Sequence, residues 1–340
     1  MKYIVCIPDH TYYLWQTLVQ IANFREMGIE KDAIYIACYF KEKSSERLQS
    51  FVDSKNIQSE FVLYKDERPS KKYSSSMRLW ILNKYFKEHP EIQHETICYM
   101  DPDVVFTKPP DFSKYMNDDI WYVSDSRSYT NSKYIKSKGD DIFQLMCDIV
   151  GIDRKTVEDN EENAGGVQYI MKNVSPDFWM KCYRDSEQLY IKTKEIGNVK
   201  VAEDKVRIAQ LLAEEETRIG RPLDEKEKND FNKKHPPYHR LQEWTADMWS
   251  VLWNAWYFGK EVKIDDGMKF SWAGHDIKDW NAKIWFHDAG VVKEDGKNFC
   301  KITHQSSPFN KEIVVSPSSC SYNYLQLIRR TEQMFPELIW

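Results

Sequence analysis

Apolar residues recur along the first hundred positions in two spacings, which predict strands and helices in alternation. Short runs of β-branched and aromatic residues predict buried strands, and apolar residues three and four positions apart predict helices. Strands are predicted at residues 2–8, 33–40, 59–66 and 96–106. Helices are predicted at residues 13–28, 46–56 and 74–90. This alternation indicates an α/β fold with a mostly parallel sheet covered on both faces.

The pattern after residue 110 is more mixed. Strands are predicted at residues 119–125, 164–174 and 284–292, and helices at 139–152, 176–195 and 243–260. The heavily charged residues 202–234 predict a solvated helix that could be an insertion. Beyond about residue 283 the chain otherwise reads as loops. Because there is no internal repeat or low-complexity linker, we expect one continuous domain.

The composition narrows the class of partner. The chain has 340 residues, of which 41% are hydrophobic, and a formal net charge of -5. A protein that binds the phosphate backbone of nucleic acid is usually basic, so nucleic acid is not the expected partner. Twelve tryptophans and twenty tyrosines are many for this length. Most should lie in the core, but sugar-binding clefts also use flat aromatic faces.

The cysteines and the apolar runs bear on localisation. Seven cysteines are scattered without a Cys-x-x-Cys pair, so we expect buried free thiols in a reducing compartment. The first apolar run is too short for a signal peptide, and no segment has the roughly 20 apolar residues of a membrane span. We therefore expect a soluble, cytoplasmic protein.

The stretch "YMDPDVVF", residues 99–106, places two carboxylates at the end of the fourth predicted strand. Pro102 favours an extended conformation at Asp101, and alternate residues of an extended segment project to the same side. Asp101 and Asp103 can therefore face one small volume, where a cation would relieve their repulsion. Hard oxygen ligands suit Mg²⁺ or Mn²⁺. Such a metal ion would in turn bind the diphosphate of a nucleotide.

A strand-end turn is the alternative for Asp-Pro-Asp, since Asp and Pro are both common in turns. The position favours a site, because ligands of parallel α/β sheets bind beyond the carboxyl ends of the strands.

Further motifs in the same order complete a resemblance to a known family. They are "SSSMRLWIL" at 74–82, "ENAGGVQYIM" at 162–171 and "HDAGVVK" at 287–293. Together with Asp-Pro-Asp, the pattern resembles the GT-A glycosyltransferases, and within them the glycogenin and galactosyltransferase-like group. The opening segment also resembles viral and algal relatives of peptidyl serine α-galactosyltransferases and hydroxyproline arabinosyltransferases.

The resemblance implies a nucleotide-binding first half, residues 1–110, and an acceptor-binding second half, residues 111–340. It implies a UDP-sugar donor, Mn²⁺ or Mg²⁺ as cofactor, and a glycan or glycoprotein acceptor. Its metal ligands would be Asp101, Asp103 and His287. Its donor-binding residues would be Pro8, Asp9, Tyr12, Arg78, Asp101, Asn163, Gly165, Gly166, Gly290 and Lys293.

Two departures from the group's pattern concern single residues. Lys293 is followed by "EDG", where the group typically has Pro-Trp. The segment containing Gln168, a candidate for contact with the sugar or for catalysis, lacks the group's downstream Asp-Gln pair. His10 is expected to shape the nucleotide loop, and His304 is a weaker substitute for His287 as a ligand.

Two carboxylates are candidates for a general base. Glu243 and Asp247 stand four residues apart and would share one helix face. Either could activate an acceptor hydroxyl if the enzyme inverts, whereas a retaining enzyme need not have a base. The alternative is an exposed carboxylate pair. One of Trp244, Trp249 and Trp272 could stack on the acceptor, although core packing is the default for all three.

The sequence thus predicts a metal-dependent glycosyltransferase, with retention favoured. A sugar nucleotidyltransferase would also use paired aspartates and a metal, but "IPDHTYY" has no glycine-rich phosphate loop. A non-catalytic sugar-binding protein would share the aromatic residues without needing the metal ligands.

Overall fold

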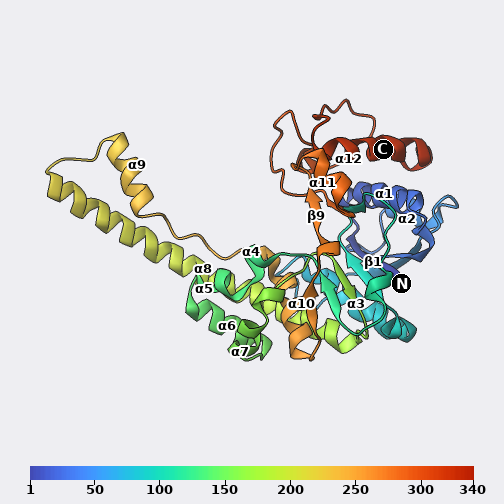
Figure 1. The fold of residues 1–340 in the computed structure, drawn as a ribbon, viewed down its shortest axis with the longest axis horizontal. Helices are drawn as coiled ribbons and strands as arrows, with labels where there is room; N and C mark the ends of the chain where they lie inside the picture. The colour runs from blue at the N-terminus through green and yellow to red at the C-terminus, as the bar shows by residue number, and fades with distance from the viewer.

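The computed structural model describes residues 1–340, and its largest sheet has seven strands in the order β3-β2-β1-β4-β7-β6-β8. All neighbouring strands are parallel except at β7, which runs antiparallel to β4 and to β6. The α/β class and the mostly parallel sheet are therefore confirmed (Figure 1). The strands are β1 Lys2–Pro8, β2 Ala33–Tyr39, β3 Glu60–Lys65, β4 Ile97–Met100, β6 Trp121–Val123, β7 Tyr169–Met171 and β8 Val262–Ile264.

A second, three-stranded sheet holds the segment that follows β4. It contains β5 Val104–Phe106, β9 Phe270–Trp272 and β10 Trp285–His287, in the order β5-β10-β9. β10 pairs antiparallel with β5, and His287 lies opposite Val104. The small sheet thus brings the C-terminal part of the chain against the Asp-Pro-Asp turn between β4 and β5.

Helices cover both faces of the large sheet, as the sequence predicts. Alternate residues of β1 enter different cores: Ile4 and Cys6 belong to a cluster of 45 buried residues, and Tyr3, Val5 and Ile7 to one of 38. The main helices are α1 Thr11–Glu26, α2 Glu46–Asp53, α3 Ser76–Glu88, α6 Asp140–Val150, α8 Pro176–Ile219, α9 Glu225–Lys234, α10 Ala246–Tyr257 and α12 Cys320–Met334. Shorter helices are α4 Arg127–Thr130, α5 Ser132–Lys136, α7 Arg154–Asp159 and α11 Ile277–Ala282.

Local signals set the start and end of the first helix. The His10 side chain accepts a hydrogen bond from the backbone N–H of Tyr12 and so caps the N-terminus of α1. The helix ends before Gly28, whose φ of 76° is a left-handed conformation that glycine adopts readily. All seven cysteines are free and buried, as predicted.

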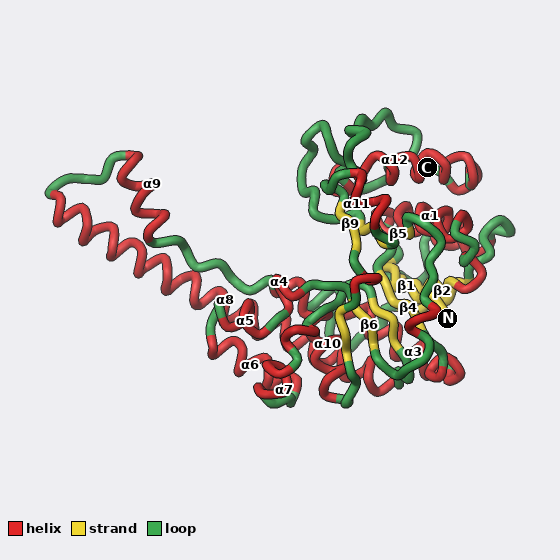
Figure 2. The backbone as a smooth tube through the Cα atoms, in the orientation of Figure 1, coloured by secondary structure: helices red, strands yellow, loops and turns green.

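The helix predicted at residues 176–195 does not end there. α8 runs for 44 residues, from Pro176 to Ile219, and with α9 it forms an arm that projects from the body (Figures 1 and 2). The charged segment at 202–234 is therefore helical and solvated, as expected, but α8 enters it without a break. Asp224 caps α9 in a reciprocal capping box with Glu227.

The C-terminal segment corrects another expectation. Residues 320–334 were expected to be loop, but they form α12, whose N-terminus is capped by the Ser319 side chain. Tyr324, Leu325 and Ile328 are buried in the same core as α1, so tertiary packing stabilises this helix. Among all the helices, none combines the length and the apolar character that crossing a membrane requires.

Candidate metal and nucleotide site

The Asp-Pro-Asp turn is held from two sides. From α1, the Gln20 side chain donates hydrogen bonds to the carbonyl oxygens of Asp101, at 2.9 Å, and Val104, at 2.7 Å. From the other side, the backbone N–H of Asp288 donates to the carbonyl oxygen of Asp103 at 2.9 Å. Because these contacts are made to the backbone oxygens of the turn, they fix the turn without engaging its two carboxylates.

Asp101, Asp103 and His287 each offer a ligand atom within 4.8 Å of the others. The His287 Nε2 lies 3.2 Å from Asp103 Oδ2, and the Trp272 ring stacks on the imidazole with centroids 5.3 Å apart. The His287 Nδ1 is buried without a hydrogen-bond partner. Two carboxylates and an imidazole fit a divalent cation such as Mn²⁺. These are the three residues that the sequence predicts as metal ligands, and the structure brings them together.

Two cations pair with the two aspartates. Arg78, from the first turn of α3, forms ion pairs with both Asp101 and Asp247, and Lys301 forms one with Asp103. Burial raises the pKa of Asp101; the Arg78 charge opposes that rise and the Asp103 charge adds to it. Burial also acts to raise the pKa of Asp103, but Lys301 and His287 outweigh it, so this pKa is lowered.

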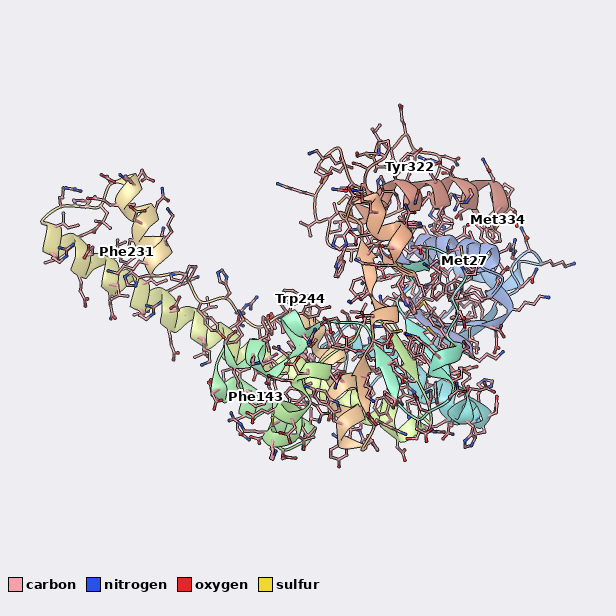
Figure 3. All side chains as sticks on the ribbon, in the orientation of Figure 1. Met27, Phe143, Phe231, Trp244, Tyr322 and Met334 are labelled. Atoms are coloured by element: carbon pink, nitrogen blue, oxygen red, sulfur yellow. The ribbon has the colours of Figure 1, made fainter.

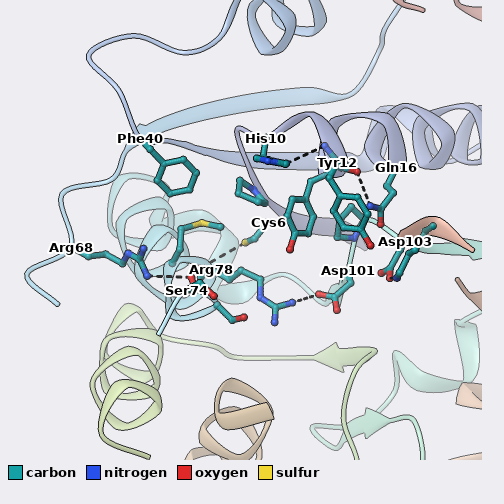
Figure 4. Close-up of a pocket in the computed structure, with 16 residues that line it drawn as sticks. Cys6, His10, Tyr12, Gln16, Phe40, Arg68, Ser74, Arg78, Asp101 and Asp103 are labelled. Carbon is teal, nitrogen blue, oxygen red and sulfur yellow. Dashed lines mark hydrogen bonds and ion pairs between the residues drawn. The ribbon is translucent and has the colours of Figure 1, made fainter. Parts of the chain in front are cut away.

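A cavity of about 440 Å³ opens directly beside the aspartates (Figure 4). Its walls come from the ends of β1 and β2, the start of α1 and the start of α3, so it lies beyond the carboxyl ends of parallel strands. Its lining includes Pro8, His10, Tyr12, Phe40, Ser74, Ser75, Arg78, Asp101, Asp103 and Lys301. Its size suits a small ligand such as a nucleotide.

Of the residues predicted to bind the nucleotide after β1, two line this cavity and one does not. Pro8 and Tyr12 are in its wall, together with His10. The Asp9 carboxylate instead accepts hydrogen bonds from the backbone N–H and the hydroxyl of Ser45, the residue that caps α2.

The predicted sugar segment packs tightly against β6. A Cβ on Gly165 would lie 2.5 Å from the carbonyl oxygen of Ser124, and one on Gly166 would lie 2.5 Å from the Tyr169 hydroxyl. Close packing therefore accounts for both glycines. Asn163 is engaged through its side-chain oxygen, which accepts from the backbone N–H of Ile264 at 3.2 Å.

Gln168 is fully buried, and both polar atoms of its side-chain amide lack a partner. The preceding residue, Val167, has a φ of 79°, which is unfavourable for a β-branched residue. Such strain amounts to about 1–3 kcal/mol and is concentrated at functional sites. This backbone outlier beside Gln168 had no signal in the sequence, since valine is not expected at positive φ.

The two candidate bases lie in different surroundings. Asp247 is buried; one carboxylate oxygen accepts a hydrogen bond from the Tyr73 hydroxyl and the other pairs with Arg78. Glu243 is also buried, and its nearest cation is Arg240 at 3.4 Å. Only Asp247 is therefore connected to the candidate metal ligands, and it is linked to them through Arg78.

The lysine at the site is Lys301, not the predicted Lys293. Gly290 has a φ of 87°, and Lys293 is exposed and does not line the cavity. Lys301 lies in the cavity wall instead. Burial acts to lower its pKa, but the Asp103 and Asp288 charges outweigh this and raise it, so Lys301 is charged.

Sequence reasoning missed Lys301, Tyr73 and Asp288. Asp288 is 1% exposed, and burial raises its pKa to about 7. No spacing or composition signal distinguishes these residues from ordinary surface or core residues. His304, the weaker ligand candidate, stacks on Phe299, and its carbonyl oxygen accepts from the Trp15 indole at 3.0 Å, so it serves packing.

The chain is similar to several solved glycosyltransferase structures. The galactosyltransferase LgtC, in complex with donor and acceptor sugar analogues, is 8% identical with a TM-score of 0.42; the match covers 97% of this chain and 96% of that one. The bifunctional glycosyltransferase WbbM is 9% identical with a TM-score of 0.43, over 99% of this chain and 51% of that one. GlyE of Streptococcus pneumoniae is 10% identical with a TM-score of 0.40, over 100% of this chain and 65% of that one.

No family model matches the chain, and no curated protein matches it.

Proposed function

We propose that this chain is a metal-dependent glycosyltransferase that moves a sugar from a UDP-sugar to a hydroxyl of a glycan or glycoprotein. The observation that carries the proposal is the cluster of Asp101, Asp103 and His287 at the edge of a nucleotide-sized cavity. Three potential ligands of a divalent cation thus lie beside a cavity that could hold a nucleotide, which supports metal-assisted departure of a diphosphate.

A divalent cation at these three residues would neutralise the charge that develops on a departing diphosphate. Of the positive charges in the cavity wall, Arg78 and Lys301 are the two that pair with the aspartates. The guanidinium fork of Arg78 and the ammonium of Lys301 would bind phosphate oxygens. Tyr12 and Phe40 offer aromatic rings in the same wall, where a nucleobase could stack.

In the proposed reaction the acceptor hydroxyl oxygen forms a bond to the anomeric carbon of the sugar. The bond from that carbon to the diphosphate oxygen breaks, and UDP departs with the electron pair. The hydroxyl proton passes to the departing diphosphate oxygen. Both oxygens of Asp247 are engaged, by Tyr73 and by Arg78, so it is not a free base; this supports retention over inversion.

Calorimetry with UDP tests the proposal most directly. We expect the protein to bind UDP in the presence of Mn²⁺ and to lose that binding when EDTA removes the metal. Asp103→Asn keeps the size of the side chain and should abolish Mn²⁺-dependent binding. Asp111→Asn, at an exposed carboxylate, is the matched control and should bind as the unmodified protein does. Circular dichroism of each variant checks that the fold is intact.

A panel of UDP-sugars with Mn²⁺ then identifies the donor, because slow transfer of the sugar to water releases UDP. The proposal is wrong if the unmodified protein binds no UDP with Mn²⁺ and releases none from any UDP-sugar. Unchanged UDP binding by Asp103→Asn would overturn the assignment of the site.

A further inference from the structure

Trp244 is the only one of the twelve tryptophans whose side chain is mostly exposed, at 62%. It lies on the surface of the body near the base of the arm (Figure 3). Large aromatic side chains contribute to stability by being buried, and Trp249 and Trp253 on the following helix are fully buried. Core packing therefore does not account for the ring of Trp244.

The backbone of Trp244 is tied to the candidate site. Its carbonyl oxygen accepts a hydrogen bond from the Tyr73 hydroxyl at 2.6 Å. The same hydroxyl contacts Asp247, which pairs with Arg78. The backbone of Trp244 is thus held, in the turn just before α10, by a residue that connects to the metal ligands, while its ring is left in solvent.

The turn that carries Trp244 leads into the helix that reaches the predicted sugar segment. Trp244 lies in the turn Glu243–Thr245, and Met248 follows in the first turn of α10. The Met248 methyl group lies 3.2 Å from the position that a Cβ on Gly166 would take. The start of α10 therefore connects the backbone of Trp244 with the predicted sugar segment.

A single sugar ring fits this surface better than a protein partner does. Between Arg240 and Met248, no other apolar side chain is mostly exposed. Protein interfaces need about 800 Å² on each partner with an apolar core, and one isolated indole does not supply that. The apolar C–H face of a pyranose can cover one indole face, while its hydroxyls stay in water.

We propose that Trp244 is the platform on which a sugar ring of the acceptor stacks. This inference rests on the proposed function and names the acceptor class of that same site: a carbohydrate that presents a pyranose ring.

Saturation-transfer NMR tests this with the methyl glycosides of galactose, glucose, N-acetylglucosamine and xylose as probes. The protein is loaded with UDP and Mg²⁺, which replaces the paramagnetic Mn²⁺. The variants are Trp244→Ala, Trp244→Phe and, as matched control, Tyr257→Ala, an aromatic residue 49% exposed at the other end of α10. Calorimetry with UDP on each variant reports on the donor site separately.

We expect at least one glycoside to give signals with the unmodified protein and with Tyr257→Ala. Trp244→Ala should weaken glycoside binding about tenfold, and Trp244→Phe should restore part of it, with UDP affinity unchanged throughout. Equal signals with Trp244→Ala, no signal from any glycoside on a protein that binds UDP, or loss of UDP binding in Trp244→Ala would each overturn the inference. Failure of the unmodified protein to bind UDP would instead contradict the proposed function, and this inference with it.

Discussion

Lys301 pairs through its ammonium group with the Asp103 carboxylate, 198 positions earlier in the chain. Both side chains are largely buried, with 16% and 11% of their surface exposed. A fixed positive charge therefore stands against the second aspartate of the Asp-Pro-Asp turn and in the wall of the cavity. If a divalent cation and a diphosphate bound together, the cation would neutralise the Asp103 carboxylate and the diphosphate would neutralise the Lys301 ammonium group.

Replacing Lys301 tests whether its charge binds the diphosphate. We expect Lys301→Ala to weaken Mn²⁺-dependent UDP binding by about ten- to a hundredfold, because hydrogen bonds to charged groups contribute roughly 1.5–3 kcal/mol. Lys293→Ala is the matched control, since Lys293 is exposed and outside the cavity wall, and it should change the affinity by less than about twofold. Calorimetry measures both. A larger effect at Lys293 than at Lys301 would restore the assignment made from the sequence.

Arg78 connects two carboxylates that would otherwise repel each other. Its side chain is 20% exposed, and those of Asp101 and Asp247 are 30% and 9% exposed. Removing one partner of a fully buried ion pair costs about 3–5 kcal/mol. Because solvent reaches Arg78 and Asp101, we expect Arg78→Ala to lower the free energy of unfolding by only about 1–3 kcal/mol.

Mn²⁺ should compensate for that loss, because the bound cation and Arg78 both neutralise Asp101. We therefore expect Mn²⁺ to raise the melting temperature of Arg78→Ala by more than that of the unmodified protein. Arg127→Ala, which removes an exposed cation paired with Asp125, is the control and should respond to Mn²⁺ as the unmodified protein does. Thermal unfolding with and without Mn²⁺ measures the difference. An equal response in Arg78→Ala would show that Arg78 and the metal do not share Asp101.

Local sequence signals predicted most elements of the first half, because most strands there are short apolar runs and the helices have their own end signals. The strand predicted at 96–106 was wrong in one respect: it divides at the Asp-Pro-Asp turn into β4 and β5, which belong to different sheets. The order of the strands and the reversed direction of β7 depend on contacts between distant segments, which no local pattern contains. The continuation of α8 was missed for a related reason. The predicted helix stops at residue 195, two residues before Gly197, and a glycine inside a helix costs about 1 kcal/mol. In the fold Gly197 lies inside α8 and packs against Arg240, with a Cβ position 3.3 Å from that side chain.

The candidate site divides in the same way. Asp101, Asp103 and His287 belong to short motifs at strand ends, so the sequence could indicate them. Lys301 follows His287 through a segment with no periodic pattern, and it reaches Asp103 only because β10 pairs with β5. The pairing of Asp247 with Arg78 likewise depends on how α3 and α10 are placed by α8, which packs against both.

Replacing Gly165 tests whether close packing, and not sugar binding alone, explains why this residue is a glycine. A Cβ there would lie 2.5 Å from a backbone oxygen and 2.5 Å from the Val123 side chain, so we expect Gly165→Ala to destabilise the fold by about 1–3 kcal/mol. Gly274→Ala is the matched control, because the nearest atom to its Cβ would be 3.8 Å away. Urea unfolding measures both. If Gly165→Ala is as stable as Gly274→Ala, the close contact with Ser124 does not explain the glycine.

Glu187 holds the loop that precedes α3 through hydrogen bonds to its side chain. It is 2% exposed on α8, and its carboxylate accepts from the backbone N–H groups of Lys72, at 3.1 Å, and Tyr73, at 3.2 Å. The hydroxyls of Ser70 and Ser76 donate to the same carboxylate. Between these anchors lie Ser74 and Ser75 in the cavity wall and Tyr73, which contacts Asp247.

Glu187→Gln puts an amide where two backbone N–H groups and two hydroxyls donate, so at least one donor loses its acceptor. We expect a loss of about 1–3 kcal/mol in the free energy of unfolding, the cost of an unsatisfied buried polar group. UDP binding should also weaken, because the loop that carries Ser74 and Ser75 is no longer fixed. Glu195→Gln, on the same helix but 61% exposed, is the matched control and should change neither quantity measurably. Urea unfolding and UDP calorimetry on both variants check this, and normal UDP affinity in Glu187→Gln would show that the loop keeps its conformation without this carboxylate.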